Sequence, residues 1–141
     1  MTGLEQMRAL LTTAQFAPIS EALQFRLTEI DEGRAVFRAT PGIHVYNPIG
    51  SVHGGYAATI LDSACGCAVH SLLSATQAYT TLELKVAYHR ALTHESGEIK
   101  AEGTVLSKGR RVAFAEAKLI DSQGRLCASA TSTLLLFDKS S

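Results

Sequence analysis

The sequence predicts an α+β protein in which an antiparallel sheet encloses one long helix. Three observations predict this architecture. Residues 54–74 are rich in alanine and leucine at helical spacing. Residues 22–40 and 78–137 alternate apolar and polar side chains, which is typical of strands with one buried face. Turn-forming residues separate the alternating segments, so we expect neighbouring strands to run antiparallel.

Length and composition limit the possible classes of protein. The 141 residues suit one domain spanning residues 1–141, and a hydrophobic fraction of 46% with a mean hydropathy of +0.11 indicates a well-filled core. Thirteen basic and thirteen acidic residues cancel, so we expect no binding to nucleic acid. The first residues lack the basic start and apolar core of a secretory signal, and no apolar run is typical of a membrane span. We therefore expect a cytoplasmic protein without membrane contact.

The first half of the chain contains a short helix and two strands. Residues 3–14 place four apolar side chains on one stripe and predict an N-terminal helix. Residues 22–30 and 34–40 alternate and predict two strands joined by the Asp-Glu-Gly turn at 31–33. Residues 41–52 are rich in glycine, proline, asparagine and histidine and predict a loop.

The second half contains the central helix and four further strands. Residues 54–74 are apolar on nearly every side, so we expect the helix to be buried all round. Strands are predicted at 78–90, 98–106, 111–120 and 125–137, in the order of a meander, and residues 138–141 form a polar, frayed tail. Cys65 and Cys67 lie two apart on this helix and point to opposite sides, so they cannot bind one metal ion together. We interpret the three cysteines as core thiols.

Asp62 is the only Lys, Arg, Asp or Glu between Arg38 and Glu83, although such residues make up 18% of the chain. A carboxylate in an apolar segment is costly unless partners or a function offset its desolvation. It could act as a general base on water or attack an acyl carbon directly. The alternative is a structural aspartate that accepts hydrogen bonds from backbone amides or a hydroxyl.

His53, Gly54 and Gly55 begin the central helix. The first amides of a helix lack internal partners and carry partial positive charge, so they can stabilise a carbonyl oxygen that gains negative charge. The alternative is that His53 only caps the helix and the glycines only form a turn. Gly54 and Asp62 are separated by about 12 Å of helical rise, so a site assembled from two subunits unites them more easily than one chain.

Three further polar features accompany these residues. Asn47 could orient His53 or a water molecule, and Thr81 offers a hydroxyl on a strand that should flank the helix. Residues 107–111 read Ser-Lys-Gly-Arg-Arg and gather three positive charges at a turn. That turn suits a phosphate-bearing ligand, but it is equally consistent with solvated surface charge.

Several motifs occur together in a recognisable order. Residues 47–55 read Asn-Pro-Ile-Gly-Ser-Val-His-Gly-Gly, residues 61–64 read Leu-Asp-Ser-Ala, residues 81–88 read Thr-Leu-Glu-Leu-Lys-Val-Ala-Tyr and residues 108–111 read Lys-Gly-Arg-Arg. The region from about 43 to 137 resembles the PaaI-like acyl-CoA thioesterases with an HGG motif, a branch of the hotdog-fold superfamily. The resemblance implies a hotdog fold and a homodimer with a continuous sheet and shared active sites, commonly within a homotetramer.

The resemblance also implies roles for individual residues. Asp62 matches the catalytic carboxylate, Gly54 the amide that polarises the thioester carbonyl, and Thr81 the residue that helps to hold the attacking water. His53 and Asn47 match residues that position the thioester and the loop. Glu83 is the least direct match, because a carboxylate near phosphates needs a cation beside it. Contacts with coenzyme A are implied for Gly55, Glu83, Tyr88, Ser107, Lys108, Gly109, Arg110, Arg111 and Val112.

The sequence therefore predicts an acyl-CoA thioesterase that uses no metal or redox cofactor, with coenzyme A as part of the substrate. The alternative is a noncatalytic module that binds or senses acyl-CoA on the same fold. A hydratase is disfavoured, because the Asp that precedes an Asn-Pro-x-His stretch in that branch is missing: Val45 and Tyr46 precede Asn47 here. Either an aromatic or a medium-chain acyl group is compatible with candidate lining residues at positions 44, 46, 56, 61 and 79.

Overall fold

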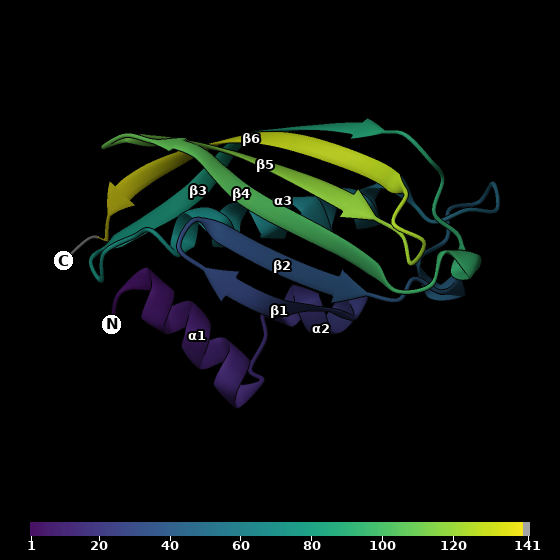
Figure 1. The fold of residues 1–141 in the computed structure, drawn as a ribbon, viewed down its shortest axis with the longest axis horizontal. Helices are drawn as coiled ribbons and strands as arrows, with labels where there is room; N and C mark the ends of the chain where they lie inside the picture. The colour runs from purple at the N-terminus through teal and green to yellow at the C-terminus, as the bar shows by residue number, and fades with distance from the viewer. Residues whose placement is uncertain (140–141) are drawn as a thin grey trace.

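Six strands form one antiparallel sheet that curves around a central helix, as the sequence predicts (Figure 1). The structure is a computed structural model and describes residues 1–139. The elements in chain order are α1 (Gly3–Thr13), α2 (Pro18–Leu23), β1 (Phe25–Asp31), β2 (Arg34–Ala39), the 3-10 turn η1 (Ile43–Val45), α3 (Gly54–His70), β3 (Gln77–Tyr88), the 3-10 turn η2 (His94–Ser96), β4 (Ile99–Lys108), β5 (Val112–Ile120) and β6 (Leu126–Asp138).

The strand order is β1-β2-β4-β5-β6-β3, so the predicted meander is confirmed for β4, β5 and β6 and is wrong for β3. β2 pairs with β4, whereas β3 lies at the far edge and pairs with β6, where Thr81 is opposite Leu134. Alternation in a sequence reports which face of a strand is buried, but it does not report which strand lies beside it. The correct faces and the turn-connected pairs β1–β2, β4–β5 and β5–β6 were therefore predicted, but the place of β3 in the sheet was not.

The core lies between α3 and the concave face of the sheet. Ile60, Leu61 and Ala64 of α3 are fully buried, and the predicted inward face of β4 is confirmed by buried Ile99 and Ala101. α3 approaches the sheet most closely at Gly103 of β4, where an added Cβ would lie 2.3 Å from the carbonyl oxygen of Ala64. Ordinary carbon–oxygen contacts are much longer, so only glycine allows this distance between helix and strand.

The prediction that the central helix is buried all round is wrong for one of its sides. Gly55 is exposed, and Thr59 and Asp62 are partly exposed, because the sheet covers α3 from one side only. The helix also ends at His70 instead of residue 74. The Ser71 hydroxyl donates to the Ala68 carbonyl oxygen and accepts the Gly33 N–H, and such side-chain bonds compete with further helix formation.

The N-terminal segment forms two helices beside β1 (Figure 1). In α1, Thr2 and Glu5 form a capping box, and the helix ends one residue before the predicted limit. α2 was not predicted, and it takes residues 22 and 23 from the expected first strand. Pro18 lies at its first turn, and Gln24 ends it in the left-handed conformation with a φ of 58°.

The remaining strand ends differ from the predicted ones by one or two residues. The predicted tail begins later, because Asp138 still pairs with Gln77 and the Lys139 N–H donates to the Thr76 carbonyl oxygen at 2.7 Å. Residues 140–141 of that tail lie outside the described residues.

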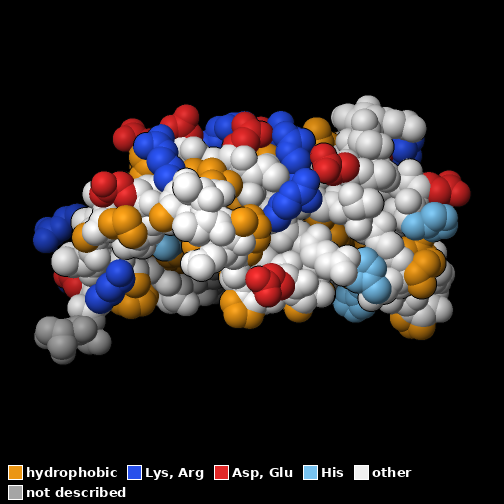
Figure 2. Space-filling view, turned by 90° about the horizontal axis from the view of Figure 1, so that it is seen from below, with side chains coloured by type: hydrophobic (Ala, Val, Ile, Leu, Met, Phe, Trp, Pro, Cys, Tyr) orange, Lys and Arg blue, Asp and Glu red, His pale blue; other side chains and the backbone are white. Residues whose placement is uncertain are grey.

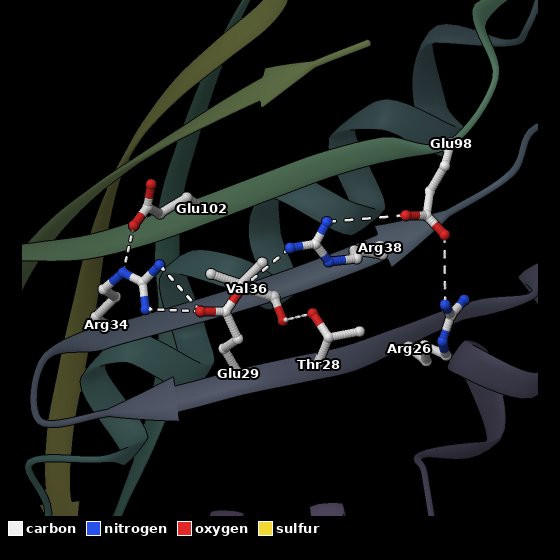
Figure 3. A network of polar contacts seen from close by, with 8 residues as sticks. All are labelled: Arg26, Thr28, Glu29, Arg34, Val36, Arg38, Glu98 and Glu102. Carbon is white, nitrogen blue, oxygen red and sulfur yellow. Dashed lines mark hydrogen bonds and ion pairs between the residues drawn. The ribbon is translucent and has the colours of Figure 1, made fainter. Parts of the chain in front are cut away.

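Charged side chains connect β1, β2 and β4 on the outer face of the sheet (Figure 3). Arg38 bonds to Glu29 at 3.2 Å and lies 3.8 Å from Glu98, and Arg34 bonds to both Glu29 and Glu102. Partial burial acts to raise the pKa of Glu29, but hydrogen bonds from Arg38 and Arg34 lower it overall. Each such pair contributes about 0–1 kcal/mol. The network therefore adds only modestly to the pairing of β1, β2 and β4, and none of its residues lines the cavities described below.

Candidate active site

Asp62 and Thr81 lie together on the open side of α3. The Thr81 Oγ1 donates to the Asp62 Oδ1 at 3.0 Å, from the edge strand β3 to the middle of the helix. The sequence predicted both residues as members of one site but could not show that they touch. The bond orients the carboxylate and occupies one oxygen, which leaves Oδ2 available to a water molecule or substrate.

Asp62 opens into a cavity of about 260 Å³. The apolar part of its lining comes from residues 7–19 and the first two strands, and the polar part comes from α3 and β3, with Ser20 from α2. The apolar lining residues are Met7, Leu10, Phe16, Ala17, Ile19, Leu27 and Phe37, and the polar ones are Ser20, Asp62, Ser63, Cys67, His70, Tyr79 and Thr81.

Asp62 is the only Asp, Glu, Lys or Arg in that lining. Burial lowers the pKa of His70, and the charge of Lys139 lowers it further, so His70 is neutral at pH 7. Burial raises the pKa of the Cys67 thiol to about 12, and the negative charge of Asp62 adds to the shift. Burial also raises the pKa of Tyr79, and the charges of Cys67 and Asp62 add to that shift. The cavity therefore contains one anionic group among neutral side chains.

The start of α3 is capped by His53. Its Nδ1 accepts the Gly55 N–H at 2.8 Å, and its own N–H donates to the Val45 carbonyl oxygen. The capping alternative weighed from the sequence is thus realised for His53. Within residues 1–139 the Gly54 N–H has no hydrogen-bond partner, so this amide remains available to a ligand.

Tyr88 holds the first turn of α3 from the end of β3. Its Oη donates to the Gly54 carbonyl oxygen at 2.6 Å. A Cβ added at Gly54 would lie 3.0 Å from the Tyr88 Oη. Gly54, His53 and Tyr88 line a second cavity, of about 290 Å³. The sequence-based role of Tyr88 was contact with coenzyme A, and the structure adds that Tyr88 positions the helix terminus.

Within one chain the two halves of the predicted site are apart. Gly54 and Asp62 line different cavities, and eight residues of helix separate them by about 12 Å along the axis. The single subunit therefore does not bring the amide and the carboxylate to one carbonyl group, as the spacing in the sequence suggested.

Asn47 closes its own loop and makes no hydrogen bond to His53. Its Oδ1 accepts the N–H groups of Ile49 and Ser51, and its Nδ2 donates to the Ser51 Oγ. An Asn side chain that satisfies nearby amides in this way is a turn-forming element. Asn47 thus shapes the loop that leads to His53.

The residues predicted to contact coenzyme A are divided between two regions. Glu83 is exposed and lies beside Thr133, on the outer face. The turn at 108–111 lines a surface cavity of about 590 Å³ near the start of β3, together with Gln77 and Asp138. Ser107 and Val112 flank that turn on β4 and β5. Tyr88 is at the other end of the 12-residue strand β3, about 36 Å from Gln77 along the strand. Gly55 lies in the first turn of α3, the turn that Tyr88 contacts.

Comparison with known protein families settles the family. The sequence model of the thioesterase superfamily matches residues 49–128, more than half of the chain and the whole stretch from His53 through Thr81. The chain belongs to the thioesterase superfamily. Hydrolysis of a thioester is the reaction class that this membership supports.

Solved structures of other proteins share the fold. The PaaI protein of the E. coli phenylacetic acid degradation operon matches with a TM-score of 0.81 and 19% identity, over 92% of this chain and 91% of that chain. A thioesterase family protein of Silicibacter pomeroyi matches with a TM-score of 0.81 and 27% identity, over 92% of this chain and 98% of that chain. The predicted hotdog fold is confirmed.

A curated relative of this thioesterase-superfamily chain is known from Halobacterium salinarum, where it is named as a presumed esterase. The two are 38% identical over 73 residues, which is 50% of this chain and 46% of the relative. The match thus spans about half the length of the curated relative.

Among residues 1–139 of this thioesterase-superfamily chain, no three His, Cys, Asp or Glu side chains are arranged to hold a metal ion. In the same residues no helix is long and apolar enough to cross a membrane.

Sequence reasoning missed the contribution of the N-terminal segment to the Asp62 cavity of this superfamily member. The apolar stripe of α1 was recognised, but its partner surface was not. The lining residues suggested from the sequence are largely wrong for this cavity: Tyr79 lines it, whereas Tyr56 and Leu61 are buried in the core. Tyr46 instead bonds to His94 in the loop region.

Proposed function

We propose that this protein hydrolyses an acyl-CoA thioester to a carboxylic acid and coenzyme A, with Asp62 as the catalytic carboxylate. The observation that supports this most directly is the Thr81–Asp62 hydrogen bond on the wall of a mainly apolar cavity. A carboxylate oriented by a hydroxyl beside a space for an apolar group suits attack on an acyl carbon. Membership of the thioesterase superfamily supports the same reaction class.

Two sequences of steps use Asp62. As a general base it takes a proton from water while the water oxygen attacks the carbonyl carbon; the C–S bond then breaks and the proton passes to the thiolate of coenzyme A. As a nucleophile it attacks the carbonyl carbon itself, releases the thiolate and forms a mixed anhydride, which water hydrolyses. In both sequences negative charge develops on the carbonyl oxygen, and neither requires a metal or redox cofactor.

The Gly54 N–H is the proposed donor to that oxygen. It is the first amide of α3, it has no partner in residues 1–139, and the helix dipole adds partial positive charge at this point. A preorganised donor of this kind contributes about 10²–10³-fold to turnover.

A homodimer would unite Gly54 with Asp62. β3 is a 12-residue edge strand, and within residues 1–139 only β6 pairs with it. A free edge of this length favours pairing with a second copy. A two-fold axis near Leu84 and Lys85 would place Thr81 opposite Tyr88 of the partner subunit. Because Thr81 holds Asp62 and Tyr88 holds Gly54, that pairing would bring the carboxylate of one subunit to the amide of the other.

The same pairing would extend the basic turn at 108–111 toward the helix terminus of the other subunit, where it could bind the phosphates of coenzyme A. Exposed Leu82, Leu106 and Phe114 provide apolar surface for a second interface, as the predicted homotetramer requires. Sedimentation equilibrium distinguishes the dimer from the tetramer as multiples of 15.0 kDa.

Thiol release tests the proposed reaction. Aryl, short, medium and long acyl-CoAs are incubated with the protein, and free coenzyme A is measured with a thiol-reactive chromophore. We expect turnover of at least one of them. Calorimetric binding of the same acyl-CoAs without thiol release would show instead a noncatalytic acyl-CoA-binding module.

Mixed dimers test the shared site. Gly54→Pro removes the N–H at a helix position that tolerates proline, and His53 already has the extended conformation that precedes proline, with φ −60° and ψ 133°. Alone, Gly54→Pro and Asp62→Asn should both be nearly inactive. Refolded as an equal mixture, they should recover about a quarter of wild-type turnover, since half the dimers contain one intact site.

Gly54→Ala is the control for Gly54→Pro, because it adds a Cβ and retains the N–H. If the refolded mixture is as inactive as each variant alone, the site belongs to a single chain.

A further inference from the structure

The N-terminal segment closes one side of the cavity that contains Asp62. Met7 and Leu10 come from α1, Phe16 from the connection and Ile19 from α2, and they face α3 and the strands across the cavity. α1 and α2 lie on the β1 side of the molecule (Figure 1). Figure 2 views the surface from below: hydrophobic side chains are spread across it, and charged ones are most numerous along the upper edge of the view. This segment is thus one wall of the cavity, and the Asp62–Thr81 pair belongs to the walls formed by α3 and β3.

The chemistry of the cavity indicates the kind of group that fits it. Its volume of about 260 Å³ is below the range of about 300–1,000 Å³ that is usual for drug-sized ligands. The N-terminal wall is apolar, and no Lys or Arg lines the cavity. An acyl group with a terminal carboxylate would lose its hydration without gaining a cation, and it would also meet the negative charge of Asp62.

We propose that the N-terminal segment, residues 7–19, selects the acyl group: the cavity takes neutral, apolar acyl chains of limited length and rejects acyl chains that end in a carboxylate. This inference rests on the proposed hydrolysis of acyl-CoA at Asp62. Leu10 and Ile19 both line the cavity without being part of the packed core, and Leu10 is the position at which the length limit is tested.

Leu10 and Leu11 provide a matched pair of variants. They are the same residue type in adjacent positions of α1, but Leu11 packs against the core and does not line the cavity. The measurement is kcat/KM for saturated acyl-CoAs in steps of two carbons. For each variant, kcat/KM for the acyl-CoA two carbons longer than the best wild-type substrate is divided by kcat/KM for that best substrate. In Leu10→Ala this ratio should rise about 10-fold, since apolar pockets discriminate added methylene groups on this scale.

Leu10→Phe should shift the optimum in the opposite direction, to a shorter chain, because the larger ring fills the cavity. Leu11→Ala should leave the length profile unchanged even where it lowers the melting temperature. A profile that is the same in Leu10→Ala, Leu10→Phe and wild type would overturn the role of this wall, while thiol release would still uphold the proposed reaction.

Hexanoyl-CoA and adipoyl-CoA test the charge selection, because they have equal carbon number and differ by one terminal carboxylate. We expect kcat/KM to favour hexanoyl-CoA by at least about 100-fold. Leu10→Lys places an ammonium group on the wall and should narrow that ratio at least about 10-fold. Equal turnover of the two substrates by the wild type would refute the charge selection. Absence of thiol release from every substrate would instead remove the proposed function, and this inference with it.

Discussion

Asparagine in place of Asp62 should lower kcat for thioester hydrolysis by at least about 100-fold. The amide still accepts the Thr81 hydroxyl at the same position, so the geometry of the wall is retained. It can no longer take a proton from water or attack the acyl carbon as an anion. The measurement is the steady-state rate of coenzyme A release, with acyl-CoA affinity measured separately by calorimetry.

Asp31→Asn is the matched control for Asp62→Asn. Asp31 is an exposed carboxylate at the end of β1 that lies 3.5 Å from Arg8, away from the cavity. Asp31→Asn removes the same charge as Asp62→Asn and should leave turnover unchanged. Wild-type kcat in Asp62→Asn would exclude both proposed roles of the carboxylate, whereas retained binding with lost turnover would support them.

Gly103→Ala should be the most destabilising single-methyl substitution in the sheet. The added Cβ would lie 2.3 Å from the Ala64 carbonyl oxygen and 3.0 Å from the Cys65 nitrogen, both in the backbone of α3. Backbone atoms in a packed helix cannot move aside as a flexible side chain can, so α3 must shift as a unit. Overpacking in a core typically costs about 1–3 kcal/mol and occasionally more; we expect about 3 kcal/mol here.

The measurement for Gly103→Ala is the free energy of unfolding in urea, with a melting temperature about 10 °C lower as the accompanying result. Gly109→Ala is the control, because its Cβ would meet only the Val112 carbonyl oxygen at an ordinary distance of 3.5 Å. The two variants add the same methyl group. An unchanged midpoint for Gly103→Ala would show that α3 is not held against β4 as closely as the structure indicates.

Local pattern was sufficient for most elements of the fold, although it missed α2. The start of α3 at Gly54 and the inward faces of the strands follow from spacing and alternation, and they are confirmed. Elements whose limits depend on single side-chain contacts were placed less well. α3 stops at His70 because Ser71 bonds to Ala68 and Gly33, and Gly33 lies 38 residues earlier in the chain.

The candidate site shows the same division. Asp62 is conspicuous in the sequence because it is isolated among apolar residues, and the Gly54 amide because it begins a helix. Their roles stay predictions. Their contacts could not be predicted in the same way. Nothing in the sequence distinguishes Thr81 from other strand threonines, and its bond to Asp62 depends on the place of β3 at the far edge of the sheet, facing α3.

By itself, the sequence determined a central apolar helix with one carboxylate, a free glycine amide at its start and a sheet of alternating strands around it. Only the tertiary structure decided which strand lies at the edge, that α1 and α2 enclose the Asp62 cavity, and that Gly54 and Asp62 face different cavities of one chain. The physical reason is the range of the interactions. Helical and strand periodicity arise between residues a few positions apart, whereas strand order and cavity walls depend on contacts between distant segments that share no local pattern.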